Sequence, residues 1–443
     1  MATGSKLRIV IVGAGFGGIS AAKSLSSKRT EVTLIDRTNH HVFQPLLYQV
    51  ATAALSPGDI AQPVRAIMRG RDNVRVVMDT VERINTHEKK VYGTSEDYDY
   101  DYLILAPGAR HAYFGHESWE QFAPGLKTLD DALHLRTQLL GTFELADRAV
   151  GSALLSEMLT FVVVGGGPTG VEMAGAIAEI SMRTMLPDFP RIRRRDVRVL
   201  LVEAGKRLLT AFDERLSGHA LRSLSELGVE VHLNTQVVDV ANNAVLLRRL
   251  TESSEQHGAD FTVQTSNIIW AAGNVASPLL KDVGAPLDKQ GRVLVEPTCQ
   301  VPGNDSVFVI GDCANLDDGT GKPLPGVAQT AVQMGAYVAR ELTNIANQHH
   351  AFVRPFRYKD LGSMATIGRA RAVADVFGLK FGGFMAWLAW AGLHILKLVS
   401  FRNRLKVLIE WLWFYVSFQP GARLLYNIHD NKKEQPTSNH QQA

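Results

Sequence analysis

A glycine turn and a later acid near the N-terminus have the residue types and spacing to bind a dinucleotide. Gly13-Ala-Gly15-Phe-Gly17-Gly18 follows the apolar run Leu7–Val12, and Asp36 ends the next apolar run, 18 residues after Gly18. In a G-x-G-x-x-G turn, the first glycine permits a tight turn, the second lets the backbone approach a pyrophosphate, and the third lets a helix pack on a strand. The N-terminus of that helix offers free N–H groups to the phosphates. Asp36 can then accept hydrogen bonds from a ribose diol.

The same arrangement occurs a second time along the chain. Gly165-Gly-Gly167-Pro-Thr-Gly170 follows the apolar run Phe161–Val164, and Glu203 ends the run Val197–Val202, 33 residues after the last of these glycines. The longer spacing comes from an inserted segment, Pro187–Asp196, whose four arginines indicate a solvated loop or, alternatively, a loop that steers an anionic ligand. Two such turns predict two dinucleotides, and a tightly bound one beside an exchanging one would permit electron transfer between them.

The elements that must position these residues are buried strands that end in turns. Each glycine turn follows a short, β-branched run typical of a parallel strand, and a helical run comes after it. Two further strands, each ended by a turn of small residues, lie at Tyr102–Gly108 and Asn267–Gly273, at a similar distance after the two glycine turns. A last strand delivers Asp312 at its carboxyl end, where doubly wound sheets bind ligands. The pattern predicts an α/β fold with two Rossmann-like domains.

Composition and charge exclude several classes of protein. Of 443 residues, 46% are apolar and 21% are charged, so the chain can bury a large core and is not a disordered one. Its 47 Lys and Arg against 44 Asp and Glu exclude a general nucleic-acid binder, which needs a strongly basic domain. Two cysteines, Cys299 and Cys313, exclude a disulfide scaffold and any four-cysteine zinc or iron–sulfur site, and no metal site is predicted.

The C-terminal region has the composition of a membrane-surface segment. Residues 380–423 contain six Lys or Arg, one acid and four of the six tryptophans. The apolar run Leu379–Phe401 is interrupted by His394 and Lys397, and a second run, 405–418, is too short for a span, which needs ~20 apolar residues. We therefore expect a helix pair that lies in the interface and is attracted to anionic lipid. A spanning helix or a purely core helix is the alternative.

The two glycine turns, the two strand-and-turn repeats and the late Gly311-Asp312 together resemble the two-dinucleotide-binding-domain flavoproteins. In that superfamily the first unit holds FAD, and a second unit inserted into it holds NAD(P)H. The segment His40–Ala51 lacks the cysteines that disulfide reductases and peroxide-reducing relatives carry at this place. Cys299 and Cys313 do not match the arrangement of sulfide:quinone oxidoreductases, and Cys313 is expected to be a small core residue.

Two motifs are similar to one family within this superfamily, the type II, non-proton-pumping NADH:quinone dehydrogenases. Phe43–Ala51 is similar to a stretch typical of the family, and Ala328–Met334 matches its A-Q-x-A-x-Q quinone-site motif. Gln329 and Gln333 lie four residues apart, so on a helix they project from one face, and neutral amides can donate to a quinone carbonyl without opposing an apolar tail. The resemblance also places Glu172 near the nicotinamide and flavin, with a role in substrate handling or proton supply. Ordinary stabilisation of the helix dipole is the alternative.

The resemblance assigns residues to each ligand. Asp312 would bind the ribityl chain of FAD. Glu203 would repel the 2′-phosphate of NADPH, although the nearby Arg207 leaves open whether NADPH is excluded. The expected FAD contacts are Gly13, Gly15, Phe16, Gly17, Gly18, Asp36, Arg37, Ala106, Gly108, Gly311, Asp312, Ala328 and Gln329. The expected NADH contacts are Gly165, Gly167, Gly170, Glu172, Glu203, Ala272 and Gly273. The expected quinone contacts are Gln44, Gln329, Gln333 and Lys380, and the expected catalytic residues are Glu172, Gln329 and Gln333.

The predicted domain organisation follows from these motifs. An FAD-binding domain is expected at residues 7–120 and 280–345, with an NADH-binding domain at 155–275 inserted in it. A C-terminal region that associates with the membrane is expected at 350–425, and a disordered tail at 430–443.

By resemblance, the chain is expected to be a membrane-associated FAD enzyme that oxidises NADH and reduces quinone by two electrons without pumping protons. Its expected partners are NADH, the quinone pool and a lipid surface, and a homodimer is left open. No secretory leader is predicted, because the first apolar run has only six residues, so the expected location is the cytoplasmic face of a bacterial inner membrane, as a peripheral protein. Two alternatives remain: a flavoprotein reductase of a soluble carrier protein, and a non-enzymatic redox sensor that binds NAD(H).

Overall fold

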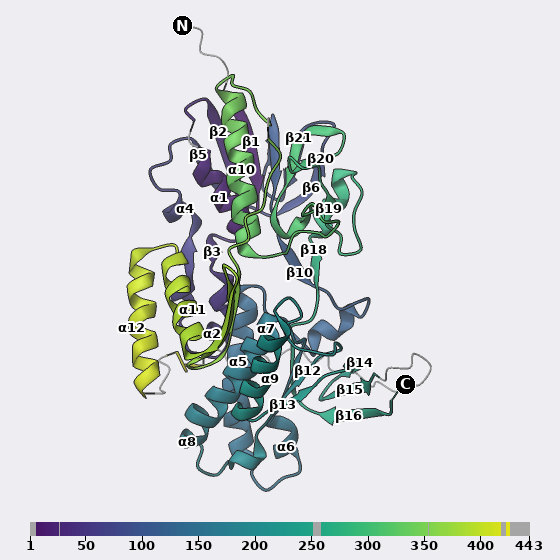
Figure 1. Ribbon diagram of the computed structural model, residues 1–443, viewed down its shortest axis with the longest axis vertical. Coiled ribbons are helices and arrows are strands. Elements are labelled where there is room, and N and C mark those ends of the chain that lie inside the picture. Colours follow the sequence, from purple (N-terminus) through teal and green to yellow (C-terminus); the bar gives the residue numbers. More distant parts are fainter. Residues whose placement is uncertain (1–5, 26, 251–257, 353, 418–421, 426–443) are drawn as a thin grey trace, which may run out of the picture. The chain divides into compact units, whose positions relative to one another are not determined.

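The computed structural model describes residues 6–25, 27–250, 258–352, 354–417 and 422–425 (Figure 1). The predicted tail, residues 430–443, lies outside the described residues. The chain divides into two units. The first unit comprises Met1–Phe43, Ala61–Gly115 and Gly273–Gly362, and the second comprises Gln44–Ile60, His116–Ala272 and Ser363–Ala443. The longest segment of the second unit therefore interrupts the first, as the predicted insertion of one Rossmann-like domain in another requires.

A six-stranded sheet forms the centre of the first unit, because its middle strands are apolar runs that are buried on both faces. Its order is β20-β21-β9-β1-β2-β5, and all neighbours except β20 and β21 are parallel. The strands predicted to precede the first glycine turn, Ala106 and Asp312 are confirmed. The bounds are β1 Leu7–Val12, β2 Thr30–Asp36, β5 Val74–Met78, β9 Tyr102–Leu105, β20 Gln300–Val301 and β21 Asn304–Val309, and the main helices are α1 Phe16–Ser24 and α10 Ala328–Ala346.

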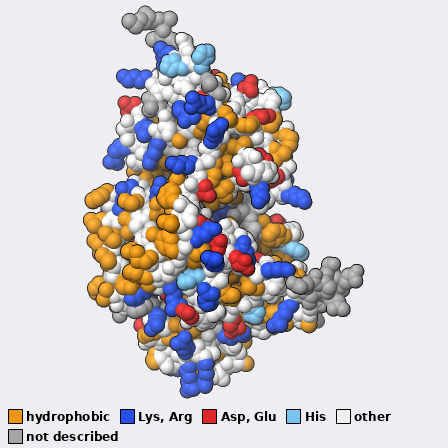
Figure 2. All heavy atoms as spheres, in the orientation of Figure 1, with side chains coloured by type: hydrophobic (Ala, Val, Ile, Leu, Met, Phe, Trp, Pro, Cys, Tyr) orange, Lys and Arg blue, Asp and Glu red, His pale blue; other side chains and the backbone are white. Residues whose placement is uncertain are grey.

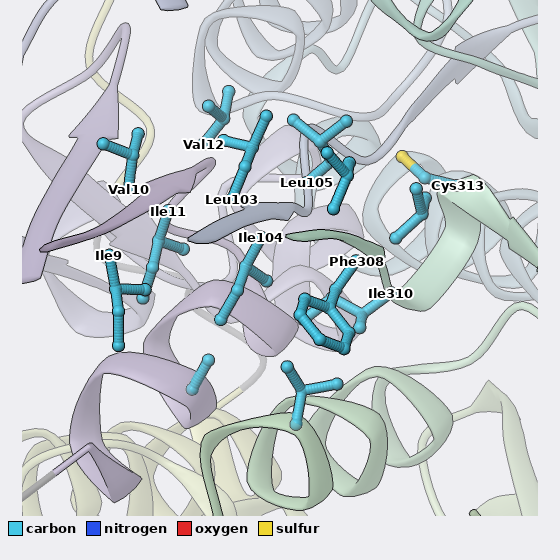
Figure 3. Close-up of a cluster of buried hydrophobic side chains, with 14 of the residues drawn as sticks. Ile9, Val10, Ile11, Val12, Leu103, Ile104, Leu105, Phe308, Ile310 and Cys313 are labelled. Carbon is cyan, nitrogen blue, oxygen red and sulfur yellow. The ribbon is translucent and has the colours of Figure 1, made fainter. Parts of the chain in front are cut away.

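The core of the first unit lies on both faces of this sheet (Figure 3). Ile9 and Ile11 point toward α1 and α10. Val10 and Val12 point to the opposite face, as the alternation of side chains along a strand requires. Cys313 is buried in this cluster, which confirms that it is a core residue, and burial raises the pKa of its thiol to about 12.

Smaller elements complete the first unit. β3 pairs with β4, β10 with β18 and β19 with β22, while β6, β7 and β8 form an antiparallel sheet. Their bounds are β3 His40–Val42, β4 Ala61–Pro63, α4 Val64–Ile67, β6 Val81–Asn85, β7 Lys90–Gly93, β8 Asp97–Asp99, β10 Ala109–His111, β18 Asn274–Ala276, η5 Pro278–Val283, β19 Val293–Leu294, η6 Gly311–Cys313 and β22 Ala314–Asn315.

The second unit is built on a four-stranded parallel sheet of order β13-β12-β11-β17. β11 lies between β12 and β17, just as β1 lies between β2 and β9 in the first unit, so the duplication predicted from the glycine turns extends to strand order. The helix after the second turn is α7, which continues beyond Glu179 as the π-helical segment η3. The bounds are β11 Thr160–Val164, α7 Pro168–Glu179, η3 Ile180–Met185, β12 Arg198–Val202, α9 Glu214–Leu227, β13 Val229–His232 and β17 Asn267–Trp270.

Other elements of the second unit surround this sheet. β14, β15 and β16 form an antiparallel sheet of their own. The predicted solvated loop at 187–196 holds only short helical turns among its described residues. The bounds are η1 Gln44–Leu46, α2 Leu47–Ala51, α3 Pro57–Ile60, η2 Glu117–Gln121, α5 Leu129–Arg148, α6 Leu154–Met158, α8 Leu186–Asp188, η4 Arg194–Asp196, β14 Thr235–Ala241, β15 Ala244–Arg249 and β16 Asp260–Gln264.

The C-terminal region combines a sheet with two helices. The strands β23 Ser363–Gly368, β24 Arg371–Val376 and β25 Leu379–Gly383 are antiparallel, and α11 Phe384–Lys397 and α12 Phe401–Ser417 follow. The expected helix pair is present, and the apolar run Leu379–Phe401 begins with a strand before its helix. Phe377 and Gly378, with φ +52° and +81°, form a two-residue hairpin turn, so the next five residues pair with β24 as a strand.

Candidate functional site: two glycine turns and an acidic cavity

The first glycine turn, residues 13–18, is closed by carbonyl groups around it. Gly13 has φ +99°, and a Cβ there would overlap the carbonyl oxygen of Ala106. A Cβ on Gly18 would overlap the carbonyl oxygen of Gly13, so neither position accepts a side chain. Gly15, in contrast, has no atom within 4 Å of its Cβ position, which leaves its backbone open to a ligand. This is the shape that a pyrophosphate requires.

The backbone of Ala14, inside this turn, makes hydrogen bonds through both its N–H and its carbonyl oxygen. Its N–H donates to Asp36 Oδ2 at 2.6 Å, and its carbonyl oxygen lies 2.9 Å from Nδ1 of the buried His41. Because a carbonyl only accepts, this Nδ1 carries a proton, and burial lowers the pKa of the ring. Asp36 Oδ1 accepts from the N–H and hydroxyl of Thr38 at 2.8 and 2.7 Å, whereas Oδ2 keeps a second lone pair for a ribose hydroxyl.

Several other residues predicted to bind FAD lie around the first turn. Gly311 and Asp312 lie just after β21, separated from it by Ile310, and a Cβ on Gly311 would lie 3.0 Å from the Cβ of Ala331 in the first turn of α10. The Cβ position of Gly17 is 3.4 Å from the carbonyl oxygen of the same alanine. The glycine turn, the end of β21 and the start of α10 therefore meet within the first unit. Arg37 is exposed.

The second glycine turn, residues 165–170, repeats the construction of the first. Gly165 has φ +109°, and a Cβ there would lie 2.8 Å from the carbonyl oxygen of Ala271. A Cβ on Gly170 would overlap the carbonyl oxygen of Gly165, and no atom lies within 4 Å of the Cβ position of Gly167. The backbone at Gly167 is therefore open to a second pyrophosphate, as the motif predicts.

Glu203 takes the place in the second unit that Asp36 has in the first. Its Oε2 accepts from the N–H of Gly166 at 2.5 Å, and its Oε1 accepts from the N–H of Gly205 at 2.6 Å. The carbonyl oxygen of Gly166 accepts from the N–H of Leu209 at 2.8 Å. Both glycine turns are thus held by the carboxylate at the end of the second strand, and each carboxylate keeps lone pairs for a ligand.

Two residues predicted for quinone, Gln329 and Gln333, lie on α10 as expected, but their amides bind backbone groups. The Nε2 of Gln333 donates to the carbonyl of Lys359, whose N–H donates back to Oε1, both at 2.9 Å. Gln329 donates to the Gly362 carbonyl at 3.1 Å and accepts from the Leu361 N–H at 3.2 Å. The two glutamines therefore hold residues 359–362, where the first unit ends. Nε2 of Gln333 still has a second N–H, the donor that a quinone carbonyl would need.

A cavity of about 80 Å³ lies within the second unit, with walls from α2, α7, β23, α11 and α12. We call it the acidic cavity, because two glutamates line it. The aromatic wall consists of Trp387, Trp390, Trp411, Phe414 and Tyr415, and the polar wall includes Tyr48, Gln49, Thr52, Glu172, Glu179, Thr366 and Arg369.

Both glutamates of the acidic cavity come from α7. This helix approaches β23 closely because Gly175 lacks a side chain: a Cβ there would overlap a carbonyl oxygen of β23. Glu172 Oε1 accepts from the N–H of Thr366 at 3.3 Å, and Glu179 Oε1 accepts from the N–H of Arg369 at 2.7 Å. Burial raises the pKa of Glu172 to about 8 and that of Glu179 to about 7. Both groups can therefore bind or release a proton near neutral pH.

A chain of hydrogen bonds follows the cavity wall from α12 to β23. Trp411 Nε1–H donates to Gln49 Oε1 at 2.7 Å, and Gln49 Nε2 donates to the hydroxyl of Tyr48 at 2.9 Å. That hydroxyl lies 2.9 Å from the hydroxyl of Thr366, the residue whose N–H binds Glu172. Burial raises the pKa of Tyr48, and the nearby Glu172 adds to the effect, so the phenol remains neutral. The wall therefore presents polar groups in fixed positions.

Three predicted site residues have other surroundings. Lys380 does not line the acidic cavity; its Nζ pairs with Asp213 Oδ2 at 3.0 Å at the surface of the second unit. Gln44 donates to the carbonyl of Lys127 at 3.3 Å, also in the second unit. Gly273 belongs to the first unit, whereas the other residues predicted for NADH belong to the second. Their proposed ligand roles stay predictions.

Sequence reasoning missed four residues that the structure places in these sites. His41, Tyr48 and Gln49 lie in or beside the stretch Phe43–Ala51, whose family likeness drew attention to it but gave none of them a role. Glu179 is seven residues after Glu172, a spacing that puts both on one face of a helix, and this was the available indication. No pattern in the sequence pairs His41 with the first glycine turn.

The helices α11 and α12 carry a continuous apolar surface. Figure 2 shows hydrophobic side chains gathered over these two helices, at the left of the view. None of the helices in the described part of the chain combines the length and apolar character that crossing a bilayer requires. We call this surface the apolar face; its exposed members are Phe384, Met385, Leu388, Leu393, Leu396, Phe401, Leu405, Leu408, Ile409, Leu412, Trp413 and Val416.

A polar contact fixes α12 to the rest of the second unit. Lys406 Nζ lies 2.6 Å from Oδ1 of Asp59, whose side chain is 1% exposed. Asn403 Nδ2 donates to the carbonyl oxygens of Gly58 and Asp59 at 3.1 and 2.9 Å. Because an unpaired buried carboxylate is costly, this ion pair holds α12 in one position.

Comparisons with known proteins agree with this architecture. A family model described as "Pyridine nucleotide-disulphide oxidoreductase" matches residues 7–335, and one described as "NDH2 C-terminal domain" matches residues 361–417. Two proteins of Mycobacterium tuberculosis, type II NADH:quinone oxidoreductases NdhA and Ndh, are 42% and 40% identical to the chain. These matches cover 95% and 94% of this chain and 89% of each relative. A solved structure of NDH2 from Plasmodium falciparum in complex with NADH has a TM-score of 0.86 at 22% identity, over 94% of this chain and 99% of that one.

Proposed function

Since the chain belongs to the family of type II NADH:quinone oxidoreductases, we propose that it oxidises NADH and reduces a membrane quinone by two electrons, through a bound FAD and without pumping protons. The observation that carries this proposal is the pair of glycine turns, one in each unit, with the same carboxylate support and the same open middle glycine. One chain with two such turns is suited to a resident dinucleotide and an exchanging one.

The first unit is the proposed FAD site. Gly15 and the N-terminus of α1 would face the pyrophosphate, Asp36 Oδ2 would accept from a ribose hydroxyl, and Asp312 would bind the ribityl chain. A flavin bound there would take two electrons from NADH and pass them to the quinone. The protein's own contribution is to hold the turn rigid before the ligand binds, which the closed surroundings of Gly13 and Gly18 support.

The second unit is the proposed NADH site. Gly167 would face the pyrophosphate, and Glu203 would accept from the adenosine ribose diol. The fixed charge of Glu203 opposes a 2′-phosphate. Arg207 would favour one, but its guanidinium is occupied within its own loop, where it donates to the carbonyls of Thr210 and Phe212 and to the hydroxyl of Ser217. These contacts support NADH as the preferred donor.

Gln329 and Gln333 are the proposed quinone contacts, with Gln44 and Lys380 as further predicted ones. Gln333 is the stronger candidate, because its Nε2 keeps an N–H that Lys359 does not use. Gln329 has less freedom, since its Nε2 also lies 3.4 Å from Asp360 Oδ1. Glu172, partly buried in the acidic cavity, is the proposed source of the proton that quinone reduction consumes.

The apolar face of α11 and α12 is the proposed membrane contact, on the cytoplasmic side of a bacterial inner membrane. Its exposed leucines and Trp413 would enter the headgroup region, and basic residues such as Arg402 and Arg404 would meet anionic lipid. The ion pair of Lys406 with Asp59 would keep the face turned outward. A quinone with a long tail would then be reached from the bilayer.

The function is tested by spectroscopy of the full chain. The purified protein should show flavin absorbance that NADH bleaches under anaerobic conditions and that a short-chain quinone restores. Protein that lacks flavin, or flavin that NADH does not bleach, would contradict the proposal. Bleaching by NADH with recovery only after a soluble carrier protein is added would favour the carrier-reductase alternative.

Membrane binding is tested by vesicle sedimentation. Replacing both Leu405 and Leu412 with Glu should release the protein from vesicles of anionic phospholipid, because charged side chains would then face the headgroup region. Leu154→Glu, at an exposed leucine on α6 outside the apolar face, is the matched control and should leave sedimentation unchanged. Equal sedimentation of the double variant and the unsubstituted protein would overturn this part of the proposal.

A further inference from the structure

The two glutamates of the acidic cavity stand on one face of α7, two helical turns apart. Glu172, Ala176 and Glu179 follow one another along this face, and all three line the cavity. The close approach of α7 to β23 at Gly175 lets each carboxylate reach a backbone N–H on the opposite side. In each case only Oε1 makes this bond among the described contacts, so Oε2 can take part in other interactions. One cavity thus presents two carboxylates.

The cavity between these carboxylates can hold water. Its volume of about 80 Å³ is several times the ~10–15 Å³ that one water needs on this scale. A water also needs two to four polar partners, and the hydroxyls of Tyr48 and Thr366 and the amide of Gln49 supply them beside the carboxylates. Glu172 and Glu179 can therefore be joined through water without either side chain moving far.

The two glutamates differ in their charged neighbours. Arg369, Arg371 and Arg183 face Glu179, and Arg183 is exposed, so Glu179 has a solvent-exposed cation beside it. Tyr48 interacts with both glutamates, more strongly with Glu172 than with Glu179. Burial raises the pKa of both carboxyl groups, to about 8 for Glu172 and about 7 for Glu179, and the three arginines partly offset the rise at Glu179. A proton can pass between groups whose affinities are this close.

We propose that Glu179 is the entry point for protons, which it takes from solvent and passes through the acidic cavity to Glu172. This inference rests on the proposed function. One turnover converts NADH, a quinone and one proton into NAD⁺ and a quinol, so NADH supplies two electrons and one proton, and solvent supplies the other proton. Glu172 gives its proton to a quinone oxygen, Glu179 reprotonates Glu172, and solvent reprotonates Glu179. Both carboxyl groups end the cycle as they began it.

Glu179 could instead serve only to hold the turn after β23, since it binds the N–H of Arg369. The variant Glu179→Gln separates the two roles, because the amide oxygen can still accept that hydrogen bond while the side chain no longer carries an exchangeable acid. Glu179→Asp restores an acid on a shorter side chain. Glu144→Gln, at an exposed glutamate on α5, is the matched control.

The experiment compares two electron acceptors in steady-state NADH oxidation by the holoenzyme at pH 7. With a short-chain quinone, Glu179→Gln should lower kcat about a hundredfold, the lower end of the range for general acid–base catalysis. With ferricyanide, which takes electrons without protons, kcat should stay within twofold. Imidazole, a small diffusible acid, should restore quinone reduction by Glu179→Gln as its concentration rises. Glu179→Asp should retain most of the activity, and Glu144→Gln all of it.

Three outcomes would overturn the inference. Equal slowing with both acceptors would show a structural role, as would a defect with quinone that imidazole does not relieve. Unchanged quinone reduction by Glu179→Gln would show that protons enter elsewhere. Failure of the proposed function is recognised separately, because the unsubstituted protein would then reduce ferricyanide but not quinone.

Discussion

The two glycine turns of this chain have one design but different partners. In both, a carboxylate at the end of the second strand binds the N–H of the residue after the first glycine, Ala14 in one case and Gly166 in the other. The carbonyl of that residue is held by the side chain of His41 in the first unit, and by the backbone N–H of Leu209 in the second. The carboxylate that binds the N–H therefore belongs to the sequence motif, whereas the group that binds the carbonyl comes from the surrounding fold.

Because of this difference, the two turns should respond to different changes in their surroundings. The first turn depends on an imidazole that can gain a proton, so its support is sensitive to pH. The second depends on a loop, residues 204–212, whose backbone cannot titrate but whose position depends on Arg207. Four predictions test this comparison.

The largest effect is expected when a side chain is added at the last glycine of each turn. Gly18→Ala would force its Cβ against the Gly13 carbonyl, and Gly170→Ala would do the same at Gly165. Gly18→Ala should purify without flavin absorbance. Gly170→Ala should keep its flavin but show bleaching by NADH at least tenfold slower in stopped-flow measurements. Gly141→Ala, where nothing lies within 4 Å of the Cβ position, should behave like the unsubstituted protein. Loss of flavin from both variants would contradict the assignment of one ligand to each unit.

A smaller effect is expected from the carboxylate of the second turn. The unsubstituted protein should use NADH at least tenfold better than NADPH in kcat/KM, or about 1.4 kcal/mol. Glu203→Gln should reduce this preference, because the charge that opposes a 2′-phosphate is removed, and should raise KM for NADH, because the amide NH₂ would face a backbone N–H. Asp36→Asn is the counterpart in the first unit and should leave the NADH preference unchanged. A preference that survives Glu203→Gln would show that another group selects the donor.

A pH-dependent effect is expected at the first turn. Burial lowers the pKa of His41 below its ordinary value, so on acidification the unfolded chain takes up this proton before the folded chain does. Stability should therefore be present above the ordinary pKa of histidine and be lost progressively as the pH falls below it. In urea unfolding monitored by flavin fluorescence, His41→Asn should reduce the loss of stability that accompanies acidification. His40→Asn, one residue earlier and less buried, should leave it in place. If His41→Asn leaves the pH dependence unchanged, the imidazole does not support the turn.

The smallest effect is expected from the loop of the second turn. Arg207→Ala removes contacts with the carbonyls of Thr210 and Phe212, and the loop that carries Leu209 should loosen. KM for NADH should rise about threefold with little change in kcat, since these hydrogen bonds are partly solvated. Flavin content should not change. Arg215→Ala, at an exposed arginine on α9, should leave KM as it is. A fall in flavin content would show that the two turns are not independent.

Much of the fold could be predicted, because local constraints dictate it. The buried strands before Gly13 and Gly165 are short apolar runs, and both glycines need a positive φ that few other residues adopt. Gln329 and Gln333 were placed on a helix from their spacing and motif. The hairpin at Phe377-Gly378 was missed because hydropathy alone does not distinguish an apolar strand from the start of an apolar helix, although its glycine marked a turn.

By itself, the sequence determined where the two dinucleotide turns lie, which acid follows each turn, and that residues 380–423 are basic and rich in tryptophan, because each of these is a local pattern of residue types. Tertiary structure alone decided the partners that come from distant segments. It paired His41 with Ala14, engaged Gln333 with Lys359, and enclosed Glu172 and Glu179 in one cavity with residues of α2, β23, α11 and α12. The physical reason is that such contacts depend on which backbone segments pack within a few ångströms of one another, and periodicity along a single segment contains no information on that packing.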